Sequence, residues 1–136
     1  MAKKSKIVII DSCVVFDYLK GSEVVRSEIF EKIGVNNAFV STITILETYY
    51  GMLKKEEADT RTFFRQINHF VIDKETSQKA IELMVGYRSQ KIGLPDCLIA
   101  ATCIVNNAQL YTYNTKDFDY IEGVKLYKPK QRQLKL

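Results

Sequence analysis

Four carboxylates in this 136-residue chain stand directly after predicted strands or in the early turns of predicted helices, namely Asp11, Glu47, Asp96 and Asp117. Like charges that meet in one pocket repel each other and raise each other's pKa unless a cation lies between them. Hard oxygen ligands select Mg²⁺ or Mn²⁺. One or two such ions can activate a water and stabilise the leaving oxygen of a phosphodiester. If the four acids converge, the chemistry they predict is metal-dependent phosphodiester cleavage.

Asp96 is the most informative of the four. It is the one charged side chain between Pro95 and Val105, in a segment that is apolar nearly all round and therefore predicts a buried helix. A helix dipole stabilises a first-turn carboxylate by about 0.3–1 kcal/mol, whereas burying an unpaired ion costs several kcal/mol. Asp96 therefore needs a cation nearby, unless the helix end that carries it is exposed.

The other three acids each have a second interpretation. Asp11 follows the apolar run IVII and lies either at the ligand-binding end of a parallel strand or simply at the N-cap of the next helix. Glu47 completes a capping box with Thr44, or lies inside a helix that starts at Ser41 or Thr42. Asp117 follows LYTY in a segment with ordinary turn chemistry, and local rules do not separate it from Asp119.

The elements that must position these acids alternate along the chain. Strands are expected near 6–10, 38–40, 70–72, 110–113 and 124–127, with helices near 12–20, 22–33, 42–54, 55–68, 74–91 and 95–106. In the helix over 42–54, the apolar stripe is formed by Ile43, Leu46, Tyr50 and Leu53. This alternation predicts an α/β fold with a parallel sheet and helices on both faces. Ligands of such folds bind beyond the carboxyl ends of the strands.

Composition and charge indicate a single cytoplasmic domain over residues 1–136. The chain is 46% hydrophobic and 26% charged, and it has no apolar run of membrane-spanning length. Residues 7–123 hold all 16 acids and 12 of the 20 basic residues, a net charge of −4, whereas both ends are basic. This distribution suits a polyanion held beside an acidic centre, although the basic ends are equally typical of solubilising tails. The chain contains no P-loop and no Gly-x-Ser-x-Gly.

Four segments in order resemble a PIN domain, and more closely a VapC-like toxin ribonuclease. They are IVIIDSC, VSTITILETYYG, GLPDCLIAATC and LYTYNTKDF, and they span about 110 residues. The resemblance implies a three-layer α/β/α sandwich on a short parallel sheet. It also implies Mg²⁺- or Mn²⁺-dependent endonucleolytic cleavage of RNA, with tRNA or rRNA as the expected substrate. The family's acidic quartet maps onto Asp11, Glu47, Asp96 and Asp117, which selects Asp117 over Asp119.

The resemblance carries further expectations. Ser12 and Asn114 match polar positions that help to shape the family's site, whereas Cys13 is a departure, because polar residues are common there. The expected partners are a cognate antitoxin protein and a second copy of the chain. From the charge pattern, the basic tail over about 125–136 is a candidate RNA-binding segment through Lys125, Lys128, Lys130 and Arg132.

Four other functions compete with a toxin nuclease. A PIN-domain nuclease that processes RNA, or an inactive RNA-binding scaffold, would share the same fold. A receiver-like signalling domain would need a second acid beside Asp11, where Ser12 and Cys13 stand instead. A phosphatase of the Asp-x-Asp type fails for the same reason, because Cys13 occupies the place of its second aspartate.

Overall fold

The computed structural model of the protein describes residues 6–129 and contains one parallel sheet of five short strands. The sheet order is β3-β2-β1-β4-β5 and every neighbouring pair is parallel. The strands are β1 (Val8–Ile10), β2 (Ala38–Ser41), β3 (Asn68–Phe70), β4 (Gln109–Tyr111) and β5 (Lys125–Leu126). The predicted α/β fold with a parallel sheet is confirmed.

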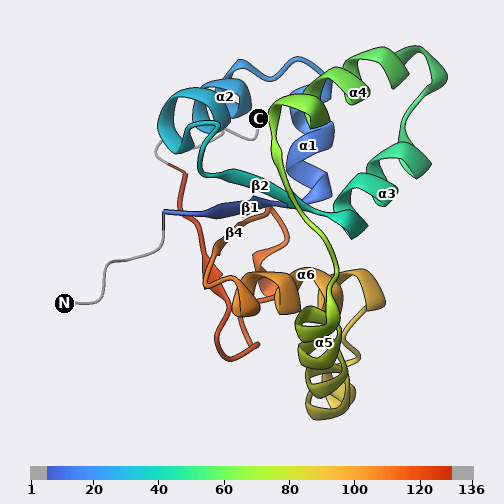
Figure 1. Ribbon diagram of the computed structural model, residues 1–136, viewed down its shortest axis with the longest axis vertical. Helices are drawn as coiled ribbons and strands as arrows, with labels where there is room; N and C mark the ends of the chain where they lie inside the picture. The colour runs from blue at the N-terminus through green and yellow to red at the C-terminus, as the bar shows by residue number, and fades with distance from the viewer. Residues whose placement is uncertain (1–5, 130–136) are drawn as a thin grey trace.

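In the described residues, six α-helices connect and cover the strands. They are α1 (Ser12–Leu19), α2 (Glu23–Ser27), α3 (Thr42–Gly51), α4 (Glu57–Gln66), α5 (Lys74–Gly86) and α6 (Leu94–Val105). Helices α1, α2 and α4 lie on one side of the strands, and α5 and α6 lie on the other (Figure 1). The sheet is therefore the middle layer of three, as the sequence predicts.

The central strand β1 explains the continuous apolar run over residues 7–10. Val8 and Ile10 pack into a cluster with residues of α1, α2 and α4, whereas Ile9 packs into a second cluster with residues of α5 and α6. All three side chains are at most 2% exposed. A strand covered on both faces needs apolar residues at every position, so polar chemistry is confined to the ends of the strands.

The order of the strands indicates the edge of the sheet at which a ligand is expected to bind. The chain winds from β1 to β2 and β3 in one direction, then returns to place β4 on the other side of β1. Ligands of such sheets bind beyond the carboxyl ends of the strands at this reversal, between β1 and β4. The order differs from the 2-1-3-4-5 order of receiver-like folds, and this difference excludes the receiver-like alternative.

Helix α3 turns only part of its apolar stripe toward the core. It begins at Thr42 as expected but ends at Gly51, and Ile43 packs, partly buried, against the cluster that contains Ile9, whereas the rest of the stripe is exposed. Leu46 is 59% exposed, Tyr50 is 94% exposed, and Leu53, just beyond the helix, is 58% exposed. The buried side chains of α3 are instead Thr44 and Thr48, whose small size allows close packing against the body. Of the predicted stripe, only Ile43 therefore packs against the core.

Several element boundaries also differ from expectation. The predicted helix over 22–33 divides into α2 and a π-helical turn over Glu28–Ile33, which ends at Gly34. Strand β3 lies two residues before its predicted position, and α5 ends at Gly86, followed by a 3₁₀ turn over Arg88–Gln90. No helix within residues 6–129 is long and apolar enough to cross a bilayer.

The chain beyond β5 is tied to the π-helical turn by a buried acid. Glu28 is 1% exposed, and its carboxylate accepts a hydrogen bond from the hydroxyl of Tyr127. The Tyr127 ring also packs at a tilt on Tyr111, and its backbone N–H donates to the carbonyl of Leu110. These contacts fix the start of the predicted basic tail, of which residues 130–136, with Lys130 and Arg132, lie outside the described part.

Removing the hydroxyl of Tyr127 tests this anchor. Tyr127→Phe deprives the buried Glu28 carboxylate of a hydrogen bond, and we expect the free energy of unfolding to fall by about 1–3 kcal/mol. Urea denaturation monitored by circular dichroism measures the change. Tyr50→Phe is the matched control, because Tyr50 is almost fully exposed and should stay within about 0.5 kcal/mol of wild type. Equal stability of wild type and Tyr127→Phe would contradict the anchor.

Candidate active site

Asp11 is a helix cap and a buried carboxylate at the same time. It follows β1, is 5% exposed, and caps α1 by accepting a hydrogen bond from the backbone N–H of Ser12 at 2.8 Å through Oδ1. Its Oδ2 accepts the hydroxyl of Thr112 at 2.7 Å. The two interpretations of Asp11 are therefore compatible, because Oδ1 uses one hydrogen bond for capping and keeps lone-pair capacity for a further ligand.

Thr112 and Cys13 are neighbours of Asp11 to which sequence reasoning gave no role in the site. The Cys13 thiol lies 3.7 Å from Asp11 Oδ2 and 3.6 Å from Thr112 Oγ1. Thr112 stands 101 residues from Asp11, so no local pattern relates the two. The available signal was topological: Thr112 directly follows β4, and β4 pairs with β1. Residues that follow neighbouring parallel strands meet at one edge of the sheet.

Glu47 comes to the same edge from α3. Ser41 is the N-cap of this helix, so Glu47 lies in the helix interior and does not form a capping box with Thr44. Burial and the Asp11 carboxylate raise the pKa of Glu47, while a hydrogen bond from the side chain of Ser12 opposes them. Among the described residues, Glu47 Oε1 is buried without a hydrogen-bond partner. An oxygen in this state is a fitting ligand for a cation.

Asp96 lies in the first turn of α6, where the helix dipole favours a negative charge. The side chain is half-buried. Burial and the carboxylates of Asp11 and Asp117 raise the pKa of Asp96 to about 6. The dipole therefore does not offset the combined cost of desolvation and like charge, as the sequence analysis expects for this position.

Asp117 and Asn114 complete the set from the segment after β4. Asp117 ends a 3₁₀ turn over Thr115–Asp117, and its backbone N–H donates to the carbonyl of Asn114 at 3.0 Å. The backbone N–H of Asn114 in turn donates to Thr112 Oγ1 at 3.0 Å. Both side chains are exposed. Asp117 is near enough to Asp96 to raise the pKa of that carboxyl, so it borders the other acids from the solvent side.

The four acids thus interact with one another, and no basic side chain between residues 6 and 129 forms an ion pair with them. Like-charge interactions link Glu47 to Asp11 and Asp96, and Asp96 to Asp11 and Asp117. Ion pairs are found within residues 6–129 between Arg61 and Glu57 on α4 and between Lys79 and Glu82 on α5. Neither includes any of these four acids. Within the same residues, no three His, Cys, Asp or Glu side chains are already gathered closely enough to hold a metal ion together.

This donor set nonetheless fits a divalent cation. It consists of carboxylate oxygens, which suit Mg²⁺ and Mn²⁺. One of its oxygens, Glu47 Oε1, is buried without a partner in the described structure, and one of its acids, Asp96, has a pKa raised by the negative charges beside it. A bound cation would relieve both conditions.

The predicted RNA-binding lysines lie elsewhere. Lys125 pairs with Gln109 at the start of β4, and its Nζ donates to Asn107 Oδ1 at 3.3 Å. It is therefore at the amino end of the sheet, opposite the carboxylates. Lys128 follows the Tyr127 anchor and is exposed. The structure does not bring either lysine to the acids, and Lys130 and Arg132 are not among residues 6–129.

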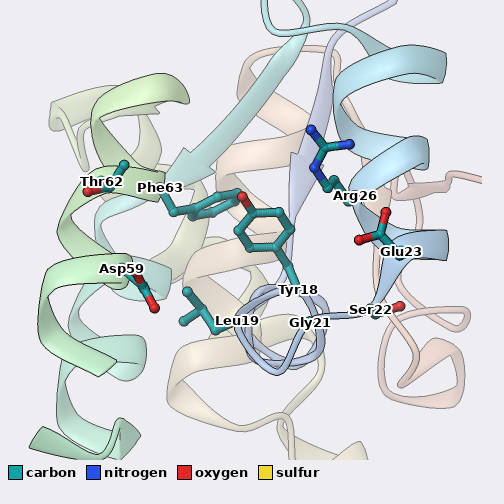
Figure 2. A pocket seen from close by; sticks show the side chains of 9 residues that line it. All are labelled: Tyr18, Leu19, Gly21, Ser22, Glu23, Arg26, Asp59, Thr62 and Phe63. Atoms are coloured by element: carbon teal, nitrogen blue, oxygen red, sulfur yellow. The ribbon is translucent and has the colours of Figure 1, made fainter. Parts of the chain in front are cut away.

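Two hollows flank helix α1. One, of about 540 Å³, lies at its amino end and is lined by polar Ser12 and Glu47 together with apolar side chains of α1 and α3, Phe16, Ile43, Leu46 and Tyr50. The other, of about 240 Å³, lies at its carboxyl end between α1, α2 and α4, where Tyr18 and Phe63 form its aromatic wall (Figure 2). The first hollow adjoins the acids, whereas none of the four acids lines the second.

The parallel sheet and the acids near the carboxyl ends of β1 and β4 are features that can be compared with those of known protein families. The family model described as PIN domain matches residues 8–124. The chain belongs to the PIN domain family, and the resemblance found in its sequence is confirmed.

Individual relatives agree with this assignment. The chain is 29% identical to Ribonuclease VapC10 of Mycobacterium tuberculosis over 87% of its own length and 90% of that protein. A toxin–antitoxin complex from Klebsiella pneumoniae contains a chain that is 28% identical, with a TM-score of 0.75 over 92% of this chain and 99% of that one. VapBC2 from Rickettsia felis, bound to a promoter DNA fragment, shares the fold with a TM-score of 0.78 at 21% identity, over 89% of this chain and 97% of that one.

The raised pKa of Asp96 predicts a gain of stability when its charge is removed. In metal-free buffer at pH 7.5, Asp96→Asn should raise the free energy of unfolding by about 1–2 kcal/mol, after allowance for solvent screening of a half-buried group. The folded-state pKa lies above the unfolded value, so the penalty develops as pH rises from about 4 to about 6 and is absent below. Thermal denaturation across this pH range measures it.

A capping aspartate provides the control of opposite sign. Asp73 caps α5 by accepting the backbone N–H of Thr76 at 2.8 Å, and these hydrogen bonds lower its pKa. Asp73→Ala should therefore destabilise the protein at pH 7.5. If Asp96→Asn were no more stable than wild type at this pH, the repulsion assigned to Asp96 would be wrong.

Proposed function

We propose that this protein is a Mg²⁺- or Mn²⁺-dependent endoribonuclease and the toxin of a toxin–antitoxin pair. The observation that carries the proposal is the group of mutually repelling carboxylates at the β1/β4 edge, with no basic side chain among the described residues to neutralise them. Membership of the PIN domain family and similarity to a protein named Ribonuclease VapC10 support the choice of RNA as substrate.

Asp11 and Asp96 are the principal ligands in this proposal, and Glu47 and Asp117 complete the site directly or through waters. When bound, the divalent cation supplies an activated water and stabilises the negative charge of the phosphodiester during hydrolysis. The hydroxyl of Thr112 and the backbone N–H of Ser12 orient the Asp11 carboxylate toward one rotamer. The side chain of Ser12 also hydrogen-bonds Glu47, so it positions a second acid.

The site residues differ in their exposure to solvent, which determines the side from which a substrate can approach. Asp11 is buried at its base, while Asp117 and Asn114 are exposed at its rim. An RNA phosphate can therefore approach from the solvent side, past the segment after β4. The polyanionic substrate is repelled by these carboxylates until a cation is present, so RNA binding at this edge should also depend on the metal.

The partner proposals rest on a surface of α3. Leu46 and Tyr50 form an exposed apolar stripe with Leu53, next to the hollow that contains Glu47. Exposed stripes of this kind mark protein–protein contacts. Similarity to a chain of a toxin–antitoxin complex supports a cognate antitoxin as one partner, and a homodimer is proposed as the resting assembly. We further propose that residues 1–136 form one catalytic domain that acts in the cytoplasm.

An RNA cleavage assay tests the proposed activity. The wild type should cleave single-stranded RNA in the presence of Mg²⁺ or Mn²⁺ and lose this activity in EDTA. Asp11→Asn and Asp96→Asn should each reduce the rate at least about 100-fold, because each removes a charged ligand of the cation. Fluorescence of a dual-labelled RNA measures the rate.

The paired acids Asp117 and Asp119 supply a matched control. Asp117→Asn should reduce cleavage, whereas Asp119→Asn, two residues away and also exposed, should leave it within about twofold of wild type. Equal metal-dependent cleavage by wild type and Asp96→Asn would overturn the assigned site. Metal binding without cleavage of any RNA would indicate the non-catalytic scaffold instead.

The basic tail makes a separate prediction. Residues 128–136 carry four basic side chains and no acid. If all four contact RNA phosphates, deleting this segment should make the slope of log K against log salt less steep by about 3, at about 0.7 per phosphate for single strands. Filter binding of RNA to the Asp96→Asn protein across salt concentrations measures the slope without cleavage. An unchanged slope would reject an RNA-binding role for the tail.

A further inference from the structure

One face of α1 holds the segment after β4 at two points. Cys13 and Asp17 lie four residues apart and therefore on the same face of the helix. At the first point, the Cys13 thiol accepts the backbone N–H of Tyr113 at 3.4 Å and adjoins Thr112. At the second, the Tyr113 hydroxyl donates to Asp17 Oδ2 at 2.7 Å.

This segment carries or contacts three groups of the candidate site. Thr112 donates to the Asp11 carboxylate, and Asn114 is held by its backbone N–H to Thr112. The next turn ends at Asp117 and is tied back to the carbonyl of Asn114. The position of Tyr113 therefore affects Asp11 through Thr112, and it affects Asp117 through Asn114.

Tyr113 is partly exposed, yet both its ring and its hydroxyl are held by neighbouring side chains. Its ring is 36% exposed at the surface, yet it packs edge-on against the buried Tyr111, with centroids 6.3 Å apart and an interplanar angle of 85°. The phenol end is then fixed by Asp17. A surface tyrosine with its ring packed and its hydroxyl paired leaves little freedom to the backbone on either side of it.

We propose that the Asp17–Tyr113 hydrogen bond is a positioning device that holds Thr112, Asn114 and Asp117 in register with Asp11 for metal binding. The inference rests on the proposed function, because it assigns Asp17 and Tyr113 to the support of that metal site. Neither residue is a ligand. Outer partners that orient metal ligands typically contribute 10- to 100-fold to metal affinity, and a hydrogen bond one residue from these groups should act at the lower end of this range.

The test measures Mn²⁺ affinity directly, by the loss of the electron paramagnetic resonance signal of free Mn²⁺, in three variants. Tyr113→Phe removes the hydroxyl but keeps the ring and the charge of Asp17, and should weaken Mn²⁺ binding about tenfold. Asp17→Ala should weaken it to a similar degree. Asp17→Asn keeps an acceptor for the hydroxyl while removing the charge, and should bind Mn²⁺ within about twofold of wild type.

The double variant and a neighbouring tyrosine make the result specific. Asp17→Ala combined with Tyr113→Phe should bind Mn²⁺ no more weakly than either single variant, because the two changes remove one interaction. Tyr18→Phe is the matched control, since Tyr18 is adjacent on α1 but packs on Phe63 in the other hollow, with its ring centroid at 4.6 Å (Figure 2). It should leave Mn²⁺ affinity unchanged.

Two results would overturn the positioning role. One is wild-type affinity in Tyr113→Phe. The other is an equal loss in Asp17→Asn and Asp17→Ala without a loss in Tyr113→Phe, which would assign the effect to the charge of Asp17. If the wild type itself bound no Mn²⁺, the proposed function would fail, and this outcome is distinct from wild-type binding that the variants leave unchanged.

Discussion

Repulsion among carboxylates held at one edge of the sheet is the constraint on which the rest of this structure depends. Asp11 is fixed by backbone and hydroxyl donors, and Asp96 is held in the first turn of a buried helix, so neither can move away freely. The pKa of Asp96 is raised to about 6 as a result. A helix N-terminus contributes about 0.3–1 kcal/mol to a carboxylate, which is less than the cost that this shift represents. The fold therefore maintains an electrostatic penalty that a divalent cation can relieve.

The topology of the sheet explains why the repelling carboxylates lie at the edge formed by the ends of β1 and β4. Both faces of β1 are covered by apolar clusters, so its polar continuation can lie only at the end of the strand. Because β4 pairs with β1, the residue that follows β4 reaches the acid that follows β1, which gives the Thr112–Asp11 hydrogen bond. Helices α3 and α6 then bring Glu47 and Asp96 to the same edge. The acids are near enough to interact but are not gathered into a three-ligand cluster in the described residues, so a bound cation would complete an arrangement that the backbone has prepared.

Much of this arrangement could be predicted from sequence, and the failures have physical reasons. The apolar run before Asp11 predicts a buried strand, and the apolar helix around Asp96 predicts a carboxylate that is costly to bury, which agrees with its raised pKa. The periodicity of α3 predicts that Leu46 and Tyr50 share one face, but periodicity does not show which face packs, and both side chains are exposed. Thr112 and Tyr113 lie about 100 residues from Asp11 and Asp17, so no local pattern relates them, and they meet through the pairing of β1 with β4. The division of the predicted helix over 22–33 into α2 and a π-helical turn leaves no local signal that propensity rules detect.

Proton release on metal binding tests the central claim most directly. Calorimetric titration of Mn²⁺ into the metal-free wild type at pH 6, repeated in buffers of different ionisation enthalpy, counts the protons that leave the protein. With the pKa of Asp96 raised to about 6 and that of Glu47 also raised, these carboxyls are partly protonated at this pH, so binding should release protons, and the release should fall to nearly zero at pH 8. Mn²⁺ binding at pH 6 with no proton release, or no binding at either pH, would contradict the account.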